Sequence, residues 1–224
     1  MDNLITLLKR ATKEERMNLG TILKVPDGDP KALTDALAWH SQHKIQYYFR
    51  DRTYTEIVQQ VARRLKMTYT LQEDVQHLER RILQRVLSDV WAKLAPEERT
   101  RIEEALREEF RATGNEGKFV GVAGLIAGIA AGKASGFGVY MLSSVVLSSM
   151  ASTLGITLPF AAYMGASRAI SVMLGPVGLV ITALSIGWAL GSPNHNKVLL
   201  AVIHIAMIRA RLDSPNLPSN LTDA

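Results

Sequence analysis

The sequence predicts an all-α protein, in which an amphipathic N-terminal helical bundle is followed by a hydrophobic, glycine-zipper helical region. In the first half, apolar residues recur at steps of three and four among charged neighbours, which is the period of helices with one buried face. In the second half, residues 117–208 contain no acid, and most of the chain's 16 glycines lie there. Helices are therefore expected in both halves, and strands are not.

Charge divides the chain into regions. The 224 residues carry a net charge of +5 and no cysteine, and this length can bury a core without disulfides or a metal. Acids and bases are balanced up to the run ATGNEGK at residues 112–118. We predict an amphipathic helical domain at 1–113, a hydrophobic, Gly-rich helical region at 117–212 and a flexible tail at 213–224. The charged residues within 117–208 are Lys118, Lys133, Arg168 and Lys197.

The N-terminal half contains several helix-start signals. In a capping box, a threonine and a glutamate three residues later bond each other's backbone amides. Boxes of this kind predict helix starts near residues 13, 54 and 71, at Thr12/Glu15, Thr53/Glu56 and Thr70/Glu73. Pro96 followed by two acids predicts another start, and its apolar stripe continues to Phe110. The run VPDGDP at residues 25–30 predicts a turn. The run Glu79–Arg81 is interpreted as paired charges on a solvated helix face.

The C-terminal half contains two uncharged segments that approach the roughly 20 apolar residues of a membrane span. The first, Ala134–Leu154, includes several serines. The second, Ala169–Leu190, includes a turn signal at Gly175, Pro176 and Gly178. Ser192 and Pro193 predict the start of a last helix, whose apolar residues continue to Ile208.

The stretch GLIAGIAAGKASG at residues 124–136 looks at first like a phosphate-binding loop. It has Ala127 in place of the first glycine and Ala134 in place of the hydroxyl that holds Mg²⁺, so a nucleotide is not expected. Glycine at every fourth position instead predicts a helix face without side chains, along which helices approach closely in a bilayer. Each such glycine costs a helix about 1 kcal/mol relative to alanine, which close packing must offset. The predicted helix-packing and self-association residues are Gly121, Gly124, Gly128, Gly132 and Gly136.

Catalytic and metal-binding patterns are missing from the sequence. The five histidines are scattered, and no nucleophile-elbow, zinc-protease or Rossmann pattern occurs. His40 and His43 share a spacing that suits a metal, but no third ligand is tied to them. The basic and aromatic run at residues 43–54 could contact nucleic acid, but it fits an amphipathic helix better. We therefore expect no enzyme activity, no cofactor, no metal and no nucleic-acid partner.

The segment Tyr54–Leu106 resembles the YaaW family of uncharacterised bacterial proteins, which is related to the helical domain of ubiquinol-cytochrome c chaperones. The opening LITLLKRATKEERMNLGTILK also looks like the short N-terminal module of that family. The resemblance implies an α-helical, non-enzymatic protein and supplies no catalytic residue. The matching motifs are Arg64-Leu65-Lys66, Leu78-Glu79, Trp91-x-Lys93-Leu94, Glu97-Glu98, Gly175-Pro176-Val177-Gly178 and an apolar helix that ends at Arg209.

These observations predict a non-enzymatic protein whose glycine-zipper region inserts into or packs at an anionic bilayer and self-associates there, with pore formation as a specific version. The four charges within the apolar region, at residues 118, 133, 168 and 197, would lie at the membrane interface. The opening MDNLITLLKR is no secretory signal, so a cytoplasmic or membrane-associated location is expected. The alternative is a soluble chaperone or adaptor for assembly of a respiratory membrane complex. In that alternative the small-residue faces form a binding groove or pack in a core behind the charged helices.

Overall fold

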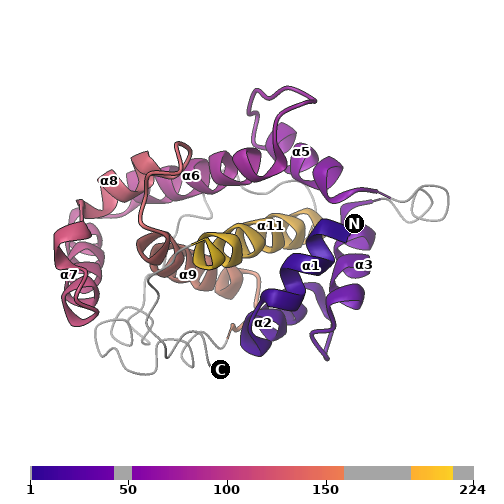
Figure 1. The fold of residues 1–224 in the computed structure, drawn as a ribbon, viewed down its shortest axis with the longest axis horizontal. Coiled ribbons are helices and arrows are strands. Elements are labelled where there is room, and N and C mark those ends of the chain that lie inside the picture. The colour runs from indigo at the N-terminus through magenta and orange to yellow at the C-terminus, as the bar shows by residue number, and fades with distance from the viewer. Residues whose placement is uncertain (1, 43–51, 159–192, 214–224) are drawn as a thin grey trace.

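The computed structural model describes residues 2–42, 52–158 and 193–213, and every regular element within these ranges is helical (Figure 1). The prediction of an all-α protein is confirmed to that extent. The predicted tail after Asp213 lies outside the described residues. The helices are α1 (Asp2–Arg10), α2 (Lys13–Leu23), α3 (Pro30–Ser41), α5 (Tyr54–Arg64), α6 (Val75–Lys93), α7 (Pro96–Ala112), α8 (Gly121–Gly128), α9 (Gly136–Thr153) and α11 (Pro193–Leu212), with a short 3-10 helix, η1 (Glu116–Lys118).

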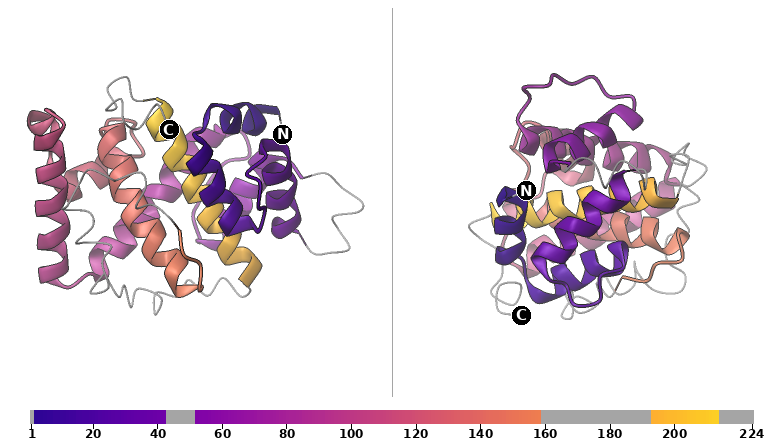
Figure 2. Two further views of the ribbon diagram at one scale, coloured as in Figure 1. Left: turned by 90° about the horizontal axis from the view of Figure 1, so that it is seen from below. Right: turned by 90° about the vertical axis from the view of Figure 1, so that its right-hand side faces the viewer.

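The helix α11 forms the centre of the molecule. Every residue from 198 to 209 is buried, as expected for a helix that is apolar on all sides. It packs against α9 and also against α2, α3 and α6, so the last described helix lies among the first ones (Figures 1 and 2). Residues from both predicted regions therefore share one hydrophobic core, and the composition change near residue 115 does not separate two cores.

Two of the predicted capping boxes are confirmed, at the starts of α2 and α5. The third prediction is wrong, because α6 begins at Val75 and not near residue 71. The carboxylate of Asp74 accepts the His77 amide at 2.9 Å and caps this helix. Glu73 instead binds the guanidinium of Arg81 at 2.8 Å, which removes it from the role that the spacing predicted. The turn predicted at residues 25–30 is confirmed between α2 and α3.

The predicted single helix face through residues 124–136 is wrong in this structure. α8 ends at Gly128, and Gly132 has φ +66°, a left-handed conformation that interrupts a helix. A Cβ on Gly128 would lie 3.0 Å from the Ala134 amide nitrogen, so this glycine packs against the chain's own loop. Gly121 also has a positive φ, +77°, at the start of α8, where Glu103 of α7 accepts the Val122 amide at 3.0 Å.

A glycine that the sequence analysis did not single out makes the close approach between helices. Gly138 lies in the first turn of α9, and a Cβ there would come within 2.9 Å of the Phe110 ring of α7. Phe110 also contacts the rings of Phe119 and Phe137, with centroids 5.1 and 5.2 Å apart. The missing side chain therefore lets α9 rest on this aromatic group.

The serines of α9 become more exposed along the helix: Ser143 and Ser144 are buried in the core, Ser148 and Ser149 are half-buried, and Ser152 is exposed. Ser144 is buried, and its hydroxyl donates to the Tyr140 carbonyl at 2.8 Å and contacts the Met207 sulfur of α11 at 3.2 Å. Among the described residues, which include the candidate segment 134–154, no helix has the length and apolar character to cross a membrane. The other candidate, Ala169–Leu190, lies outside the described residues, together with Arg168 and the turn residues Gly175, Pro176 and Gly178.

Candidate functional site

Two buried ion pairs fix the C-terminal end of α11. Arg211 is bound through Nε and Nη2 to the carboxylate of Glu15 in α2, at 2.6 and 2.7 Å. Arg209 is bound in the same bidentate way to Glu79 of α6, at 2.8 and 3.2 Å. Burial opposes the charge of Arg209, but the hydrogen bonds and charge of Glu79 outweigh it and raise the pKa of the guanidinium. Such pairs hold a helix in one register, since breaking either leaves a charge buried without its partner.

Glu15 connects this end of α11 to the start of α2. Its carboxylate accepts the Thr12 amide at 2.8 Å in the capping box, and its backbone carbonyl lies 2.9 Å from Nε2 of His204. A carbonyl oxygen can only accept, so Nε2 of the neutral ring carries the hydrogen. Burial lowers the pKa of His204, although the hydrogen bond and the charge of Glu15 oppose this change. The imidazole is therefore neutral at pH 7.

A different arrangement lies near the N-terminal end of α11. Lys197 of α11, Lys24 at the end of α2 and His40 of α3 lie close enough for their charges to interact, and we call these residues the basic cluster. Burial and the charge of Lys24 lower the pKa of Lys197. Burial also lowers the pKa of His40, whose Nε2 lies 3.1 Å from the Leu23 carbonyl. Within the described residues, no carboxylate pairs with either lysine.

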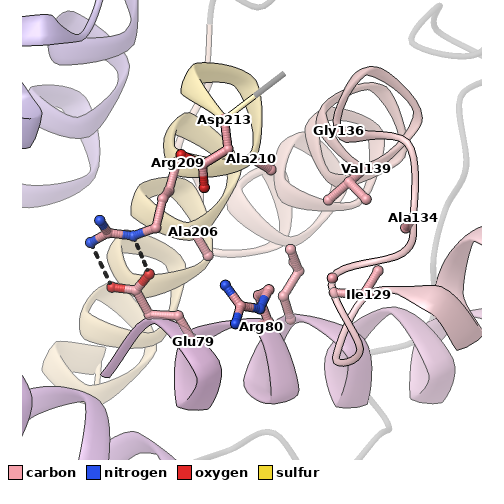
Figure 3. A pocket seen from close by; sticks show the side chains of 12 residues that line it. Glu79, Arg80, Ile129, Ala134, Gly136, Val139, Ala206, Arg209, Ala210 and Asp213 are labelled. Carbon is pink, nitrogen blue, oxygen red and sulfur yellow. Dashed lines mark hydrogen bonds and ion pairs between the residues drawn. The ribbon is translucent and has the colours of Figure 1, made fainter. Parts of the chain in front are cut away.

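A pocket of about 190 Å³ opens between α6, α9, α11 and the loop from 129 to 136 (Figure 3). The Glu79–Arg209 pair forms one side, and Asp213 lies at the end of α11. The rest of the lining is mostly small or apolar: Leu83, Ile129, Gly132, Ala134, Gly136, Val139, Ala206 and Ala210. The left-handed turn at Gly132 is therefore part of a pocket wall and not of a helix-packing face.

Arg80 extends from α6 into this pocket (Figure 3). Its Nε is buried and has no hydrogen-bond partner, and its guanidinium forms no ion pair with the rest of the described chain. The interpretation of residues 79–81 as charges paired on a solvated face is therefore wrong. Glu79 is buried against α11, and Arg81 pairs with Glu73. The guanidinium of Arg80 has no acidic partner among the described residues.

The structure separates the predicted interface charges. Lys118 at the end of η1 donates to Asn115 at 2.9 Å, Lys133 is exposed in the loop before α9, and Lys197 belongs to the basic cluster. Lys24 was not predicted as a site residue, because its neighbours in the basic cluster come from distant parts of the chain. Among the described residues, no group of histidines and acids could hold a metal ion. No family model, no curated protein and no solved structure matches this chain.

Proposed function

We propose that this chain is a non-enzymatic helical protein that associates with anionic membranes. The uncharged segment Ala169–Leu190 would pack at or enter the bilayer, and the charged helices would stay in water. The segment has 22 residues, counted from 169 to 190, and a span requires about 20. The observation that carries the proposal is the basic cluster, which lies near the start of α11, the helix that follows this segment in the chain.

The chemistry of the basic cluster favours an anionic lipid headgroup. Lys197 and Lys24 repel each other, and the described chain supplies no carboxylate to either of them. A phosphate placed between the two ammonium groups would relieve the repulsion and replace water lost from Lys197. Each lysine near an anionic surface contributes about 1 kcal/mol, and salt weakens the attraction. Binding should therefore require anionic lipid and should decline as ionic strength rises.

Co-sedimentation of the full chain with vesicles tests this proposal. We expect binding to equimolar phosphatidylglycerol and phosphatidylcholine, and little binding to phosphatidylcholine alone. The double variant Lys24→Gln/Lys197→Gln should bind roughly tenfold to thirtyfold more weakly, since about 2 kcal/mol is lost. The variant Lys9→Gln/Lys93→Gln has the same net charge but keeps the basic cluster, and it should bind almost as the parent does. If both double variants lost the same amount of vesicle affinity, the loss would come from net charge alone. That result would overturn the role of the basic cluster.

The apolar segment has its own test. Ile181→Asp places a charge in the middle of Ala169–Leu190, where a bilayer core penalises it by several kcal/mol. We expect protection of the segment from added protease by vesicles in the parent and its loss in this variant. Complete failure of the parent to bind anionic vesicles would end the membrane proposal. The soluble chaperone or adaptor suggested by the YaaW resemblance would then be the working hypothesis.

Self-association through Gly121, Gly124, Gly128, Gly132 and Gly136 stays a prediction. A continuous helical zipper would require residues 129–135 to leave their present loop. The variant Gly132→Ala distinguishes the present loop from a zipper helix, because the change in stability has the opposite sign in the two conformations. In the left-handed loop the alanine should cost about 1 kcal/mol of stability, whereas in a helix it should gain about 1 kcal/mol. We expect a lower urea midpoint in water, and stronger self-association on vesicles only where the zipper helix forms.

A further inference from the structure

We propose that the pocket between α6, α9 and α11 binds a small apolar monocarboxylate, with the Arg80 guanidinium as its counter-ion. The inference is independent of membrane binding, since the pocket shares no residue with the basic cluster. It depends on three properties of the pocket, namely an arginine without a partner among the described residues, an apolar wall and a limited volume.

Arg80 supplies the charge that selects an anion. The pocket contains a second guanidinium, but Arg209 already has both oxygens of Glu79 bound to it. Arg80 has a buried Nε that forms no hydrogen bond with any described residue. A carboxylate accepts two parallel hydrogen bonds from the planar guanidinium fork, which suits this unsatisfied donor better than a single hydroxyl or carbonyl would.

The wall and the volume select the rest of the ligand. Leu83, Ile129 and Val139 come from three different elements and give the pocket an apolar side. A dry cavity of about 150 Å³ accommodates benzene, so about 190 Å³ suits a ring or short alkyl chain that carries one carboxylate. Inorganic phosphate would place its remaining charge against this apolar side and close to the carboxylates of Glu79 and Asp213.

Calorimetric titration of the full chain with sodium benzoate tests the proposal. We expect saturable binding of benzoate at one site, with benzamide and inorganic phosphate each at least tenfold weaker. Arg80→Gln should weaken benzoate binding at least tenfold, and Arg80→Lys, which keeps the charge without the fork, should give an intermediate loss. Arg85→Gln removes an arginine of the same helix that lies outside the pocket and pairs with Asp89, so it should leave benzoate binding unchanged.

Two further variants examine the size and the charge of the site. Ala210→Leu fills the pocket from the half-buried side of α11 and should abolish binding while Arg80 stays in place. Asp213→Asn should leave benzoate binding unchanged or tighten it, because a carboxylate is removed from the lining. Equal binding of benzamide and benzoate, or an Arg80→Gln variant that binds as the parent does, would overturn the proposal. The proposal would also be overturned if phenylalanine bound more tightly than benzoate and if Asp213→Asn weakened the binding of phenylalanine. That result would identify a site for a zwitterion.

Discussion

At its C-terminal end, α11 carries Arg209 and Arg211, each joined by two hydrogen bonds to a buried glutamate, whereas its N-terminal half carries Lys197 beside Lys24 without a described carboxylate. The arginines also lie where the helix dipole favours positive charge, and a cation near the other end gains no such help. The two arginines are buried, whereas Lys197 is only half-buried, so burial and pairing differ together between the two ends.

The charges at the two ends of α11 therefore differ in what they do for the fold. The paired arginines connect α11 to α2 and α6, and they specify which helices surround it. The two lysines of the basic cluster form no such ion pair within the described residues, and we propose that they are kept for an anion from outside the chain. Charge that fixes the fold should be costly to remove, and charge that is kept for a ligand should not be. The following predictions test this difference, beginning with the largest expected effect.

Glu15→Ala should cause the largest loss of stability. It leaves Arg211 buried without its partner, which costs roughly 3–5 kcal/mol, and it removes the capping box of α2. Urea unfolding followed by circular dichroism measures the loss. Glu14→Ala, one residue earlier in the same first turn, is the matched control and should cost under about 1 kcal/mol. Similar losses in the two variants would mean that the Arg211 pair does not fix α11.

Arg209→Met should cost about 3 kcal/mol, because Glu79 is left as a buried charge beside the Tyr54 phenol. The double variant Glu79→Leu/Arg209→Met removes both charges and should recover most of this loss, since apolar replacements of a buried pair are often neutral. The same unfolding measurement compares the two. A double variant as unstable as the single one would show that packing around residue 209 matters and not the pairing.

Stability should decline as the pH falls below about 6.5. The unfolded chain binds a proton at each histidine near the ordinary pKa of 6.5, whereas burial lowers the pKa of His204 in the folded state. Unfolding therefore takes up protons in this window, and a histidine whose pKa is lowered in the folded state contributes up to about 1.4 kcal/mol per pH unit. His204→Gln keeps a donor for the Glu15 carbonyl and should flatten the profile between pH 5 and 6.5. His40→Gln should also flatten it, but less, because His40 is only half-buried. An unchanged profile in His204→Gln would contradict the assignment.

Lys197→Gln should have the smallest effect on stability, within about 0.5 kcal/mol in either direction. The substitution removes a partly buried charge and its repulsion from Lys24. Thermal unfolding in the absence of lipid measures this effect, and Lys93→Gln at the exposed end of α6 serves as the control. A loss above about 1 kcal/mol would mean that Lys197 has a stabilising partner, and the contrast between the two ends of α11 would fail.

Local signals in the sequence predicted the starts of α2, α5, α7 and α11 correctly. Thr12 and Thr53 start helices as predicted because each capping box is complete within four residues and depends on little else. Thr70 failed because Asp74 offers a competing cap and Arg81 captures Glu73. The glycine spacing failed for a related reason. Glycine every four residues fits a smooth helix face, but Gly132 is also suited to the left-handed turn that the structure contains.

The candidate sites were less accessible to prediction. Arg80 belongs to a run of charges that looks like an ordinary solvated helix face. Only the position of α11 shows that the adjacent Glu79 pairs with Arg209 and not with Arg80. Glu79 is taken by Arg209, which is 130 residues away in the chain, and Glu15 is taken by Arg211, which is 196 residues away. No periodicity or short motif connects residues at such separations.

The helical class, the starts of α2, α5, α7 and α11, and the uneven distribution of charge follow from residues within one or two turns of each other, so the amino-acid order alone determined them. The partners of the buried charges, the lack of a partner for Arg80 within the described ranges and the assembly of the basic cluster depend on α11 lying between α2, α3 and α6. A charge without a partner costs free energy only when it is removed from water, and a side chain is removed from water only when distant helices pack around it.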